Sequence, residues 1–295
     1  MLFIGEISAL VAAFLWSNSS IVFTAAAIRI GSIQLNIDRM LLAAFYLIIV
    51  ILIFQIDISL SFSQFFLLAV SGIIGLIIGD TAIFKSFAEI GPRFTMLFYS
   101  LNPAIAALFS WIILDEKLSR NGIIGMFITI VGIAIVALAK KDNGSKFSIN
   151  SKGVFYGIMS AVGQGVGLVF AKMAYSYGNL HSLTATVVRI SSSVIVMLII
   201  SLIIKRYNNP IKLYRNDVKS FKLVALGSVI GPFLGITLSF VALEHTSVGI
   251  AATLMSTTPI MLIPLSKYYY KENIHISSIV GTVIAVLGIA LLFLV

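Results

Sequence analysis

The chain contains no cysteine and few charged residues, and both absences narrow its function. Without cysteine it has no structural disulfide, no thiolate metal ligand and no thiol nucleophile. Its three histidines, His181, His245 and His275, are too scattered along the sequence to form a metal cluster. Charged residues make up only 11% of the 295 residues, against roughly 25% in an ordinary soluble domain. The composition excludes a soluble protein, and no metal site, cofactor or catalytic cluster is expected.

Most of the charge that is present is positive, but it forms no basic face. Lys and Arg number 20 and Asp and Glu number 11, which gives a net charge of +9. A nucleic-acid-binding protein would gather this charge on one face, interleaved with aromatic residues. Here the basic residues lie in short polar gaps between apolar segments, so no nucleic-acid partner is expected.

Long apolar runs dominate the sequence, with 59% hydrophobic residues and a mean hydropathy of +1.09. About 20 mostly apolar residues cross a bilayer, and the chain supplies such runs roughly ten times. The first run lacks a basic leading region and is followed by further runs, so we expect a retained helix and not a secretory signal. The predicted fold class is an all-α polytopic membrane protein of ten transmembrane helices. The expected spans are 5–27, 33–54, 63–89, 94–113, 119–139, 153–176, 182–204, 222–244, 248–268 and 277–295.

The sequence also contains an internal repeat. A shift of 156 residues aligns Ala69–Ala134 with Ala225–Ala290 without a gap. Chance similarity among apolar residues would not bring Gly, Pro and Glu into register. Upstream, Gly5 aligns with Gly153 and Arg39 with Arg189 at slightly shorter shifts. The aligned pairs within the 156-residue shift include Gly75 with Gly231, Gly79 with Gly235, Thr81 with Thr237, Pro103 with Pro259, Glu116 with Glu272, Gly125 with Gly281 and Gly132 with Gly288.

Each half of the chain is expected to hold five spans. Because five is odd, the second half would enter the membrane from the opposite side, as in inverted-repeat secondary transporters. We expect a first repeat at 1–140 with helices 1–5, a polar linker at 141–152 and a second repeat at 153–295 with helices 6–10. In such transporters the substrate site lies near mid-membrane between the repeats. A duplicated helical scaffold without transport is the alternative.

Several short motifs occur in the same order in both halves. The first half has Leu15-Trp16-Ser17-Asn18, Asp38-Arg39, Leu101-Asn102-Pro103 and Leu114-Asp115-Glu116-Lys117-Leu118-Ser119, and the second has Arg189, Ala242-Leu243-Glu244-His245-Thr246-Ser247, Thr258-Pro259 and Glu272. With this ordered set the chain resembles the drug/metabolite transporter superfamily, in particular ten-helix members with two EamA-type repeats. The resemblance covers nearly the whole chain. It implies a transporter of small organic metabolites such as amino acids, sugar conjugates, nucleotide derivatives or lipophilic cations.

The two halves differ chemically at the places where a substrate would bind. Trp16 aligns with Gln164, and Asp80 with Ile236. Asp80 and Lys172 lie deep in apolar spans, where an ionisable residue is costly and therefore a functional candidate. Facing the cavity, Asp80 would bind an amine or carry a coupling proton, whereas paired with a lysine it would only brace the helices. The candidate substrate-binding residues are Trp16, Asn18, Asp80, Tyr99, Asn102, Gln164 and Lys172.

The aromatic and amide side chains of this set suit a small zwitterionic or heteroaromatic ligand. Hydrogen bonding between neighbouring helices is the alternative for the amides. The glycines of the stretch Gly163–Gly167 and of the repeated pairs are predicted to let helices approach closely. Pro103 and Pro259 are expected to kink the fourth and ninth spans, either as paired gating elements or as static kinks.

Two further pairs of positions have structural interpretations. Glu116 and Glu272 precede the fifth and tenth spans, where a carboxylate favours a helix N-terminus. Arg39 and Arg189 lie near the starts of the second and seventh spans and are expected to be interface anchors or partners of carboxylates such as Asp38.

The leading interpretation is a secondary transporter in the plasma membrane that works by alternating access, with export the expected direction. A channel or scramblase, a lipid-handling protein and a non-transporting scaffold are the alternatives. An enzyme is not expected, and the substrate and any coupling ion, including H+, stay open. Counting Lys and Arg in alternate gaps places fourteen opposite the termini and two beside them. The positive-inside rule then puts the termini outside, whereas the resemblance implies cytosolic termini.

Overall fold

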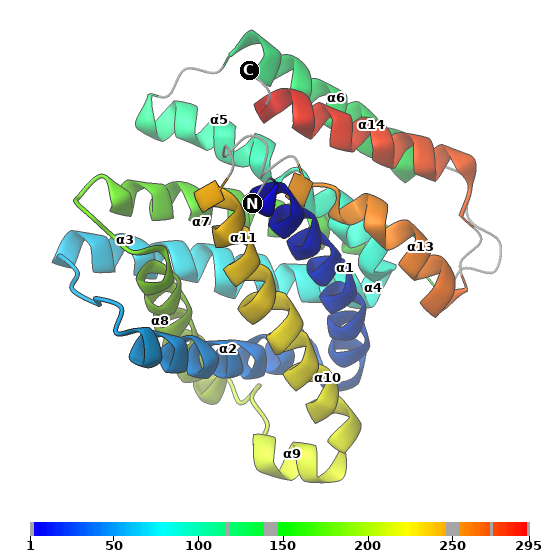
Figure 1. Ribbon diagram of the computed structural model, residues 1–295. Coiled ribbons are helices and arrows are strands. Elements are labelled where there is room, and N and C mark those ends of the chain that lie inside the picture. The colour runs from blue at the N-terminus through cyan, green and yellow to red at the C-terminus, as the bar shows by residue number, and fades with distance from the viewer. Residues whose placement is uncertain (1–2, 116–118, 139–146, 246–253, 272–273, 294–295) are drawn as a thin grey trace.

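The computed structural model describes residues 3–115, 119–138, 147–245, 254–271 and 274–293. Within these ranges every regular element is helical, and no strand occurs (Figure 1). Two elements, η1 and η2, are π-helical. The helices are α1 (Ile4–Ile30), α2 (Ser32–Phe54), α3 (Phe62–Gly72), η1 (Ile73–Gly79), α4 (Asp80–Tyr99), α5 (Asn102–Leu114), α6 (Arg120–Leu138), α7 (Ser151–Tyr175), α8 (Ser182–Ile203), α9 (Pro210–Asn216), α10 (Val218–Ser228), η2 (Val229–Gly235), α11 (Ile236–His245), α13 (Thr258–Tyr270) and α14 (Ile276–Phe293).

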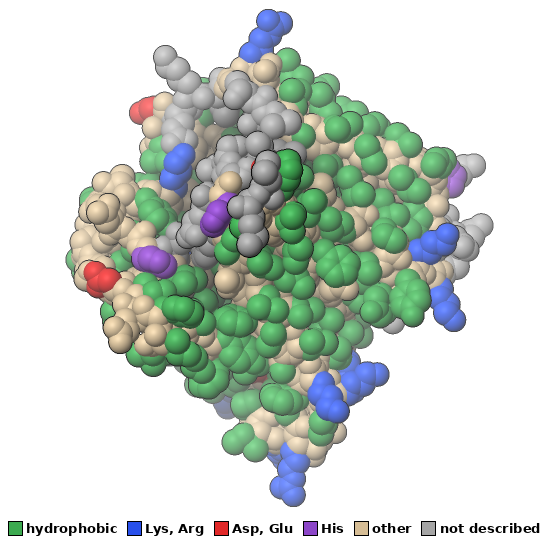
Figure 2. Space-filling model, viewed as in Figure 1, with side chains coloured by type: hydrophobic (Ala, Val, Ile, Leu, Met, Phe, Trp, Pro, Cys, Tyr) green, Lys and Arg blue, Asp and Glu red, His purple; other side chains and the backbone are tan. Residues whose placement is uncertain are grey.

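Seven helical segments in the described part of the chain are long and apolar enough to cross a membrane. Two shorter apolar helices, Asn102–Leu114 and Ile276–Leu291, accompany them. Hydrophobic side chains cover the broad face seen in Figure 2, and most Lys and Arg side chains lie at its edges. This surface suits lipid and not water. The prediction of an all-α polytopic membrane protein is confirmed, while the count of ten crossings stays a prediction. The seven segments are Ile4–Ile30, Ser32–Phe54, Phe62–Tyr99, Arg120–Ala137, Ser151–Tyr175, Leu183–Ile203 and Val218–Ser239.

The 156-residue shift that relates the two halves of the sequence also relates their helices. The seven residues of η1 and the seven of η2 begin and end at positions that differ by this shift. The same is true of α5 and α13, and α6 and α14 begin at equivalent residues. A π-helix is rare and is often found at functional sites. Its recurrence at one place in each half marks that place as part of the common architecture.

The expected third and fourth spans are separated by a sharp turn at Gly91. This residue has φ +76°, a left-handed conformation that glycine adopts without strain. The Ser86 and Thr95 hydroxyls, nine residues apart, lie 2.8 Å from each other across the turn. The chain therefore reverses direction within the segment Phe62–Tyr99.

Pro103 and Pro259 begin helices and do not kink them. The expected fourth span is interrupted after Tyr99, and Pro103 is the second residue of α5. Pro259 has the same place in α13. In the first helical turn a backbone N–H has no helical partner, so proline there removes no hydrogen bond. The expected kinks therefore take the form of helix breaks just before each proline, and a gating role for them stays a prediction.

Glycines bring the last helices of the two halves into close contact. Figure 1 shows α6 and α14 side by side, and they form the most extensive contact between any two helices of the described chain. A Cβ on Gly132 would lie 2.6 Å from the carbonyl oxygen of Gly281, and one on Gly288 would lie 2.5 Å from the backbone nitrogen of Thr129. Thr129 also donates a hydrogen bond of 3.3 Å to the Ala285 carbonyl. The packing interpretation of these glycine pairs is confirmed.

The Gly163–Gly167 stretch of α7 has the same use. A Cβ on Gly163 would come within 2.8 Å of the Gly79 Cα, and one on Gly167 within 2.9 Å of the Ser71 carbonyl oxygen. Close packing of α7 against α3 and η1 places Gln164 at the centre of the molecule, and this stretch acts in packing as predicted.

Candidate functional site

A cavity of about 290 Å³ lies where helices of both halves meet. Two larger hollows, of about 430 and 400 Å³, are lined mainly by apolar side chains with one charged residue each. Residues of both halves line all three, but the central cavity has three charged residues, so it is the candidate site. Its lining residues are Trp16, Ser19, Ser20, Phe23, Arg39, Leu76, Asp80, Ile83, Phe84, Phe87, Met96, Tyr99, Gln164, Arg189, Gly231, Pro232 and Ile236.

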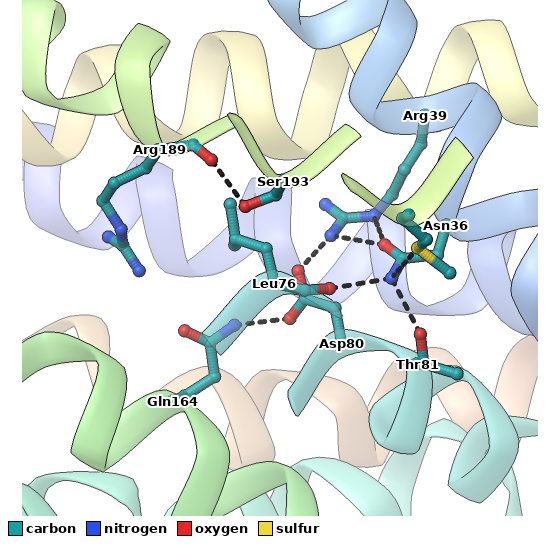
Figure 3. A network of polar contacts seen from close by, with 9 residues as sticks. Asn36, Arg39, Leu76, Asp80, Thr81, Gln164, Arg189 and Ser193 are labelled. Atoms are coloured by element: carbon teal, nitrogen blue, oxygen red, sulfur yellow. Dashed lines mark hydrogen bonds and ion pairs between the residues drawn. The ribbon is translucent and has the colours of Figure 1, made fainter. Parts of the chain in front are cut away.

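Asp80 is the centre of a polar network that joins the two halves (Figure 3). Nη2 of Arg39 forms an ion pair with Oδ2 of Asp80, and Nε2 of Gln164 donates a hydrogen bond to Oδ1. Both charged side chains are only 11% exposed. Asp80 therefore faces the cavity with a fixed positive partner, which is an arginine and not a lysine.

Asn36 fixes the arginine of this pair in place. Its Oδ1 accepts hydrogen bonds from Nε and Nη2 of Arg39 at 3.2 and 3.0 Å. Its Nδ2 donates to the Leu76 carbonyl in η1 at 2.8 Å and to the Thr81 hydroxyl at 3.0 Å. The Arg39 guanidinium also lies 4.9 Å from the ring centroid of Phe84, a cation–π geometry. The guanidinium is thus held on several sides before any ligand enters.

Arg189 is the second arginine of the cavity, and its surroundings differ. It reaches the cavity from α8, and its Nε is buried without a hydrogen-bond partner among the described residues. Figure 3 shows its guanidinium standing apart from the Asp80 network, while its backbone carbonyl accepts from the Ser193 hydroxyl at 2.6 Å. The second guanidinium of the site is therefore left open.

Each π-helical segment packs against a side chain of the other half of the chain. In η1, a Cβ on Gly79 would lie 3.3 Å from Cγ of Gln164. In η2, a Cβ on Gly235 would lie 2.7 Å from Cδ1 of Trp16. The two glycines are equivalent by the repeat, and so are the side chains they contact. The alignment of Trp16 with Gln164 thus corresponds to equivalent places in the structure.

Asp38 anchors the linker around α9 and does not pair with Arg39. Nε2 of Gln34 donates to its carboxylate at 2.9 Å and Tyr207 donates at 2.7 Å, and Tyr214 donates as well. Burial, together with the hydrogen bond to Asp38, raises the pKa of Tyr214 and of Tyr207 above the usual range. Arg39 thus has a carboxylate partner, as one of the two expectations held, but that partner is Asp80 and not Asp38, which these hydroxyl and amide donors already surround.

The structure brings four of the seven candidate binding residues to the cavity, namely Trp16, Asp80, Tyr99 and Gln164. Asn18 instead donates a 2.8 Å hydrogen bond to the Phe14 carbonyl of its own helix. Asn102 begins α5 and Lys172 is exposed on α7, and neither lines the cavity. Lys172 is eight residues from Gln164, which turns an α-helix about 80° away from the same face. Glu116 and Glu272 lie outside the described residues.

Sequence reasoning assigned Arg39 and Arg189 to anchoring or structural pairing, and both line the cavity. It also missed Asn36 and the apolar aromatic wall, which includes Phe23 and Phe84. The signal for the arginines was present, because they are the span cations that occur at equivalent positions of both halves. An apolar aromatic residue inside an apolar span carries no such signal.

These features define a multi-pass helical membrane protein built from two related halves around a polar central cavity. The sequence profile of the EamA-like transporter family matches residues 3–138 and again residues 151–294. The chain belongs to this family, which is part of the drug/metabolite transporter superfamily and consists of transporters and not enzymes. A small-molecule substrate and contact with membrane lipid follow from membership.

Two individual proteins are also similar to this chain. Protein LicB of Haemophilus influenzae is 28% identical over 162 residues, which are 55% of this chain and 52% of LicB. The match thus spans about half the length of that relative. A solved crystal structure aligns with a TM-score of 0.69 at 16% identity, over 98% of this chain and 96% of its own. This likeness shows a shared fold.

Proposed function

We propose that the chain is a secondary transporter that carries small organic metabolites, amino acids or related compounds among them, across the plasma membrane. Transport takes place by alternating access around the central cavity, with export the expected direction. The units 1–140 and 153–295 cross the membrane five times each in opposite orientation. The observation that carries the proposal is the cavity itself, which equivalent elements of the two halves enclose with a charged network at its wall.

The contacts between halves give the proposal a mechanism. Gln164 of the second half bonds Asp80 of the first, and Trp16 of the first half packs on Gly235 of the second. Rocking of one half against the other exchanges the environments of equivalent elements. These two contacts are therefore the ones that change as the cavity opens from one side to the other.

Saturable flux in reconstituted vesicles tests this proposal. Ligands are first selected by thermal stabilisation of the purified chain, since a compound that binds only the folded state raises the melting temperature. Uptake of such a ligand saturates and is inhibited by unlabelled ligand, which a channel or scramblase would not reproduce. Gln164→Ala lowers this flux, and Asn18→Ala, on the same cavity-forming bundle but outside the lining, leaves it unchanged. Flux that never saturates, or no flux of any stabilising ligand, refutes secondary transport.

We place the α9 end of the molecule in the cytosol and the termini outside, following the distribution of Lys and Arg. Because the chain lacks cysteine, single introduced thiols report sidedness without background. Lys212→Cys in α9 and Ser59→Cys after α2 are both at exposed positions, at opposite ends of the helices. An impermeant thiol reagent on intact cells labels only the second. The reverse pattern puts the termini in the cytosol.

A further inference from the structure

Among the described residues, only one of the two duplicated arginines of the cavity forms an ion pair. Arg39 and Arg189 occupy equivalent positions in the repeat and both line the cavity. Directly after η1 the first half places Asp80, which pairs with Arg39. Directly after η2 the second half places Ile236. The carboxylate that neutralises the first arginine has no counterpart for the second.

The charges of the cavity therefore do not balance. Its lining contains two guanidinium groups, of Arg39 and Arg189, and one carboxylate, of Asp80, so the net charge of the described lining is positive by one. A cation inside a membrane span is costly unless an anion accompanies it. Asp80 already has its oxygens engaged by Arg39 and Gln164. The remaining positive charge is at Arg189, whose Nε is buried without a hydrogen-bond partner in the described part of the chain.

We propose that Arg189 binds a carboxylate group of the transported compound, and that the substrate class is small organic carboxylates. That the bound compound is transported rests on the proposed function, whereas its binding at Arg189 does not. A guanidinium offers paired N–H donors whose spacing matches the two oxygens of a carboxylate. Arg39 is less suited to this role, because its charge is paired with Asp80 and its Nε and Nη2 already donate to Asn36 and Asp80.

The other residues of the cavity determine which chemical groups the rest of the ligand can have. Trp16, Phe23, Phe84 and Tyr99 supply aromatic side chains to its wall. At about 290 Å³ the cavity is at the low end of known ligand sites. The preferred ligand is therefore a compact molecule with one carboxylate and one apolar or aromatic portion.

Sets of ligands that share one aromatic portion and differ in the polar group, a carboxylate, an alcohol or an amine, test the proposal. One set is benzoate, benzyl alcohol and benzylamine, and a second is phenylacetate, phenylethanol and phenylethylamine. The purified full chain in detergent is titrated with each, and thermal stabilisation and competition give apparent affinities. We expect the carboxylate of at least one set to bind more tightly than its alcohol and its amine. Equal or tighter binding of the alcohol or amine, or no binding of either carboxylate, overturns the proposal.

Two kinds of variant locate the effect at the second arginine. Arg189→Gln weakens carboxylate binding by about 10-fold to 100-fold, the value of charge-assisted hydrogen bonds. Lys172→Gln removes one positive charge from an exposed position in the same half and leaves the affinity unchanged. Unchanged carboxylate affinity in Arg189→Gln refutes the assignment.

A substitution at the unequal position of the repeat provides an independent test should Arg189→Gln fail to fold. Ile236→Asp adds a carboxylate to the wall of the same cavity and cancels its net charge. Ile236→Asn has nearly the same shape without the charge. We expect carboxylate affinity to fall in the first variant by about tenfold relative to the second, and equal affinities in the two overturn the proposal. Carboxylate binding without saturable flux would instead refute only transport, and saturable flux of an amine or alcohol by the unmodified protein, with no binding of either carboxylate, would refute only the carboxylate site.

Discussion

The ion pair between Arg39 and Asp80 makes a quantitative prediction about stability. Both side chains are 11% exposed, so each charge depends on the other and on its hydrogen-bond partners more than on water. Removing one partner of a buried pair leaves an uncompensated charge and costs about 3–5 kcal/mol. Asp80→Asn keeps the shape of the side chain and the bond from Gln164, so the loss isolates the charge. At roughly 2–4 °C per kcal/mol the melting temperature falls by about 6 °C or more.

A double-mutant cycle measures this loss. Thermal unfolding in one detergent is followed for wild type, Asp80→Asn, Arg39→Gln and the double variant. In the double variant no buried charge is left alone, and replacing both partners of a buried pair is often nearly neutral. We therefore expect most of the lost stability to return. Asp217→Asn removes the carboxylate of an exposed pair with Arg29 and serves as the matched control, with a small effect.

Two outcomes refute the reasoning. A melting temperature of Asp80→Asn within about 2 °C of wild type would mean less than roughly 1 kcal/mol from the pair. Strict additivity of the two single losses in the double variant would mean that the side chains act separately. Either result would remove the fixed counter-charge on which the proposed role of the second arginine depends.

Three further predictions concern packing, the helix breaks and pH. Gly132→Ala places a methyl group against the backbone of α14 and costs about 1–3 kcal/mol, measured by thermal unfolding. Pro103→Ala, at a helix start, costs only about 0.4–1 kcal/mol and leaves the turnover number unchanged, and slower turnover at equal affinity would restore a gating role. The hydrogen bond from Arg29 lowers the pKa of Asp217 from 3.8 to about 2. Because this pKa is lowered, the stabilisation is present above pH 3.8 and disappears as the pH falls through about 2, which a pH series of unfolding with Asp217→Asn as reference will detect.

Much of the fold could be predicted from the sequence because lipid imposes a simple rule. A spanning helix needs a long apolar run, and such runs are visible without any knowledge of packing. The repeat was visible because Gly75 and Gly231, or Pro103 and Pro259, stand out from a background of interchangeable apolar residues. The same register then reappears in the bounds of η1 and η2.

The breaks within spans could not be predicted in detail. Pro103 signals that the helix is interrupted nearby, but a proline is acceptable both at a kink and in a first turn. Only the backbone of the preceding residues decides between the two, and that depends on the packing of α4 and α5. No local rule marks Ile73–Gly79 as π-helical either, since its residues also suit an α-helix.

The site was predicted in part, for reasons that differ between its residues. Asp80 could be identified from the sequence because placing a carboxylate deep in an apolar span is energetically costly, and such residues are usually functional. Its partner Arg39 is 41 positions away, and only the packing of α2 against α4 brings them together. The same argument selected Lys172, which is exposed in the structure. That prediction failed because the sequence does not say which side of α7 meets the cavity.

The difference between the two halves gives the cavity two arginines but only one carboxylate. A perfectly symmetric duplication would pair both arginines with a carboxylate and leave a neutral, self-satisfied cavity. The exchange of one such carboxylate for Ile236 leaves Arg189 without an ion pair among the described residues, while Asp80 keeps Arg39 in place. An anionic ligand that pairs with Arg189 is attracted by its charge and also offsets the free-energy cost of burying that guanidinium. Because residues of both halves line this cavity, we expect occupancy by such a ligand to be coupled to the relative position of the halves.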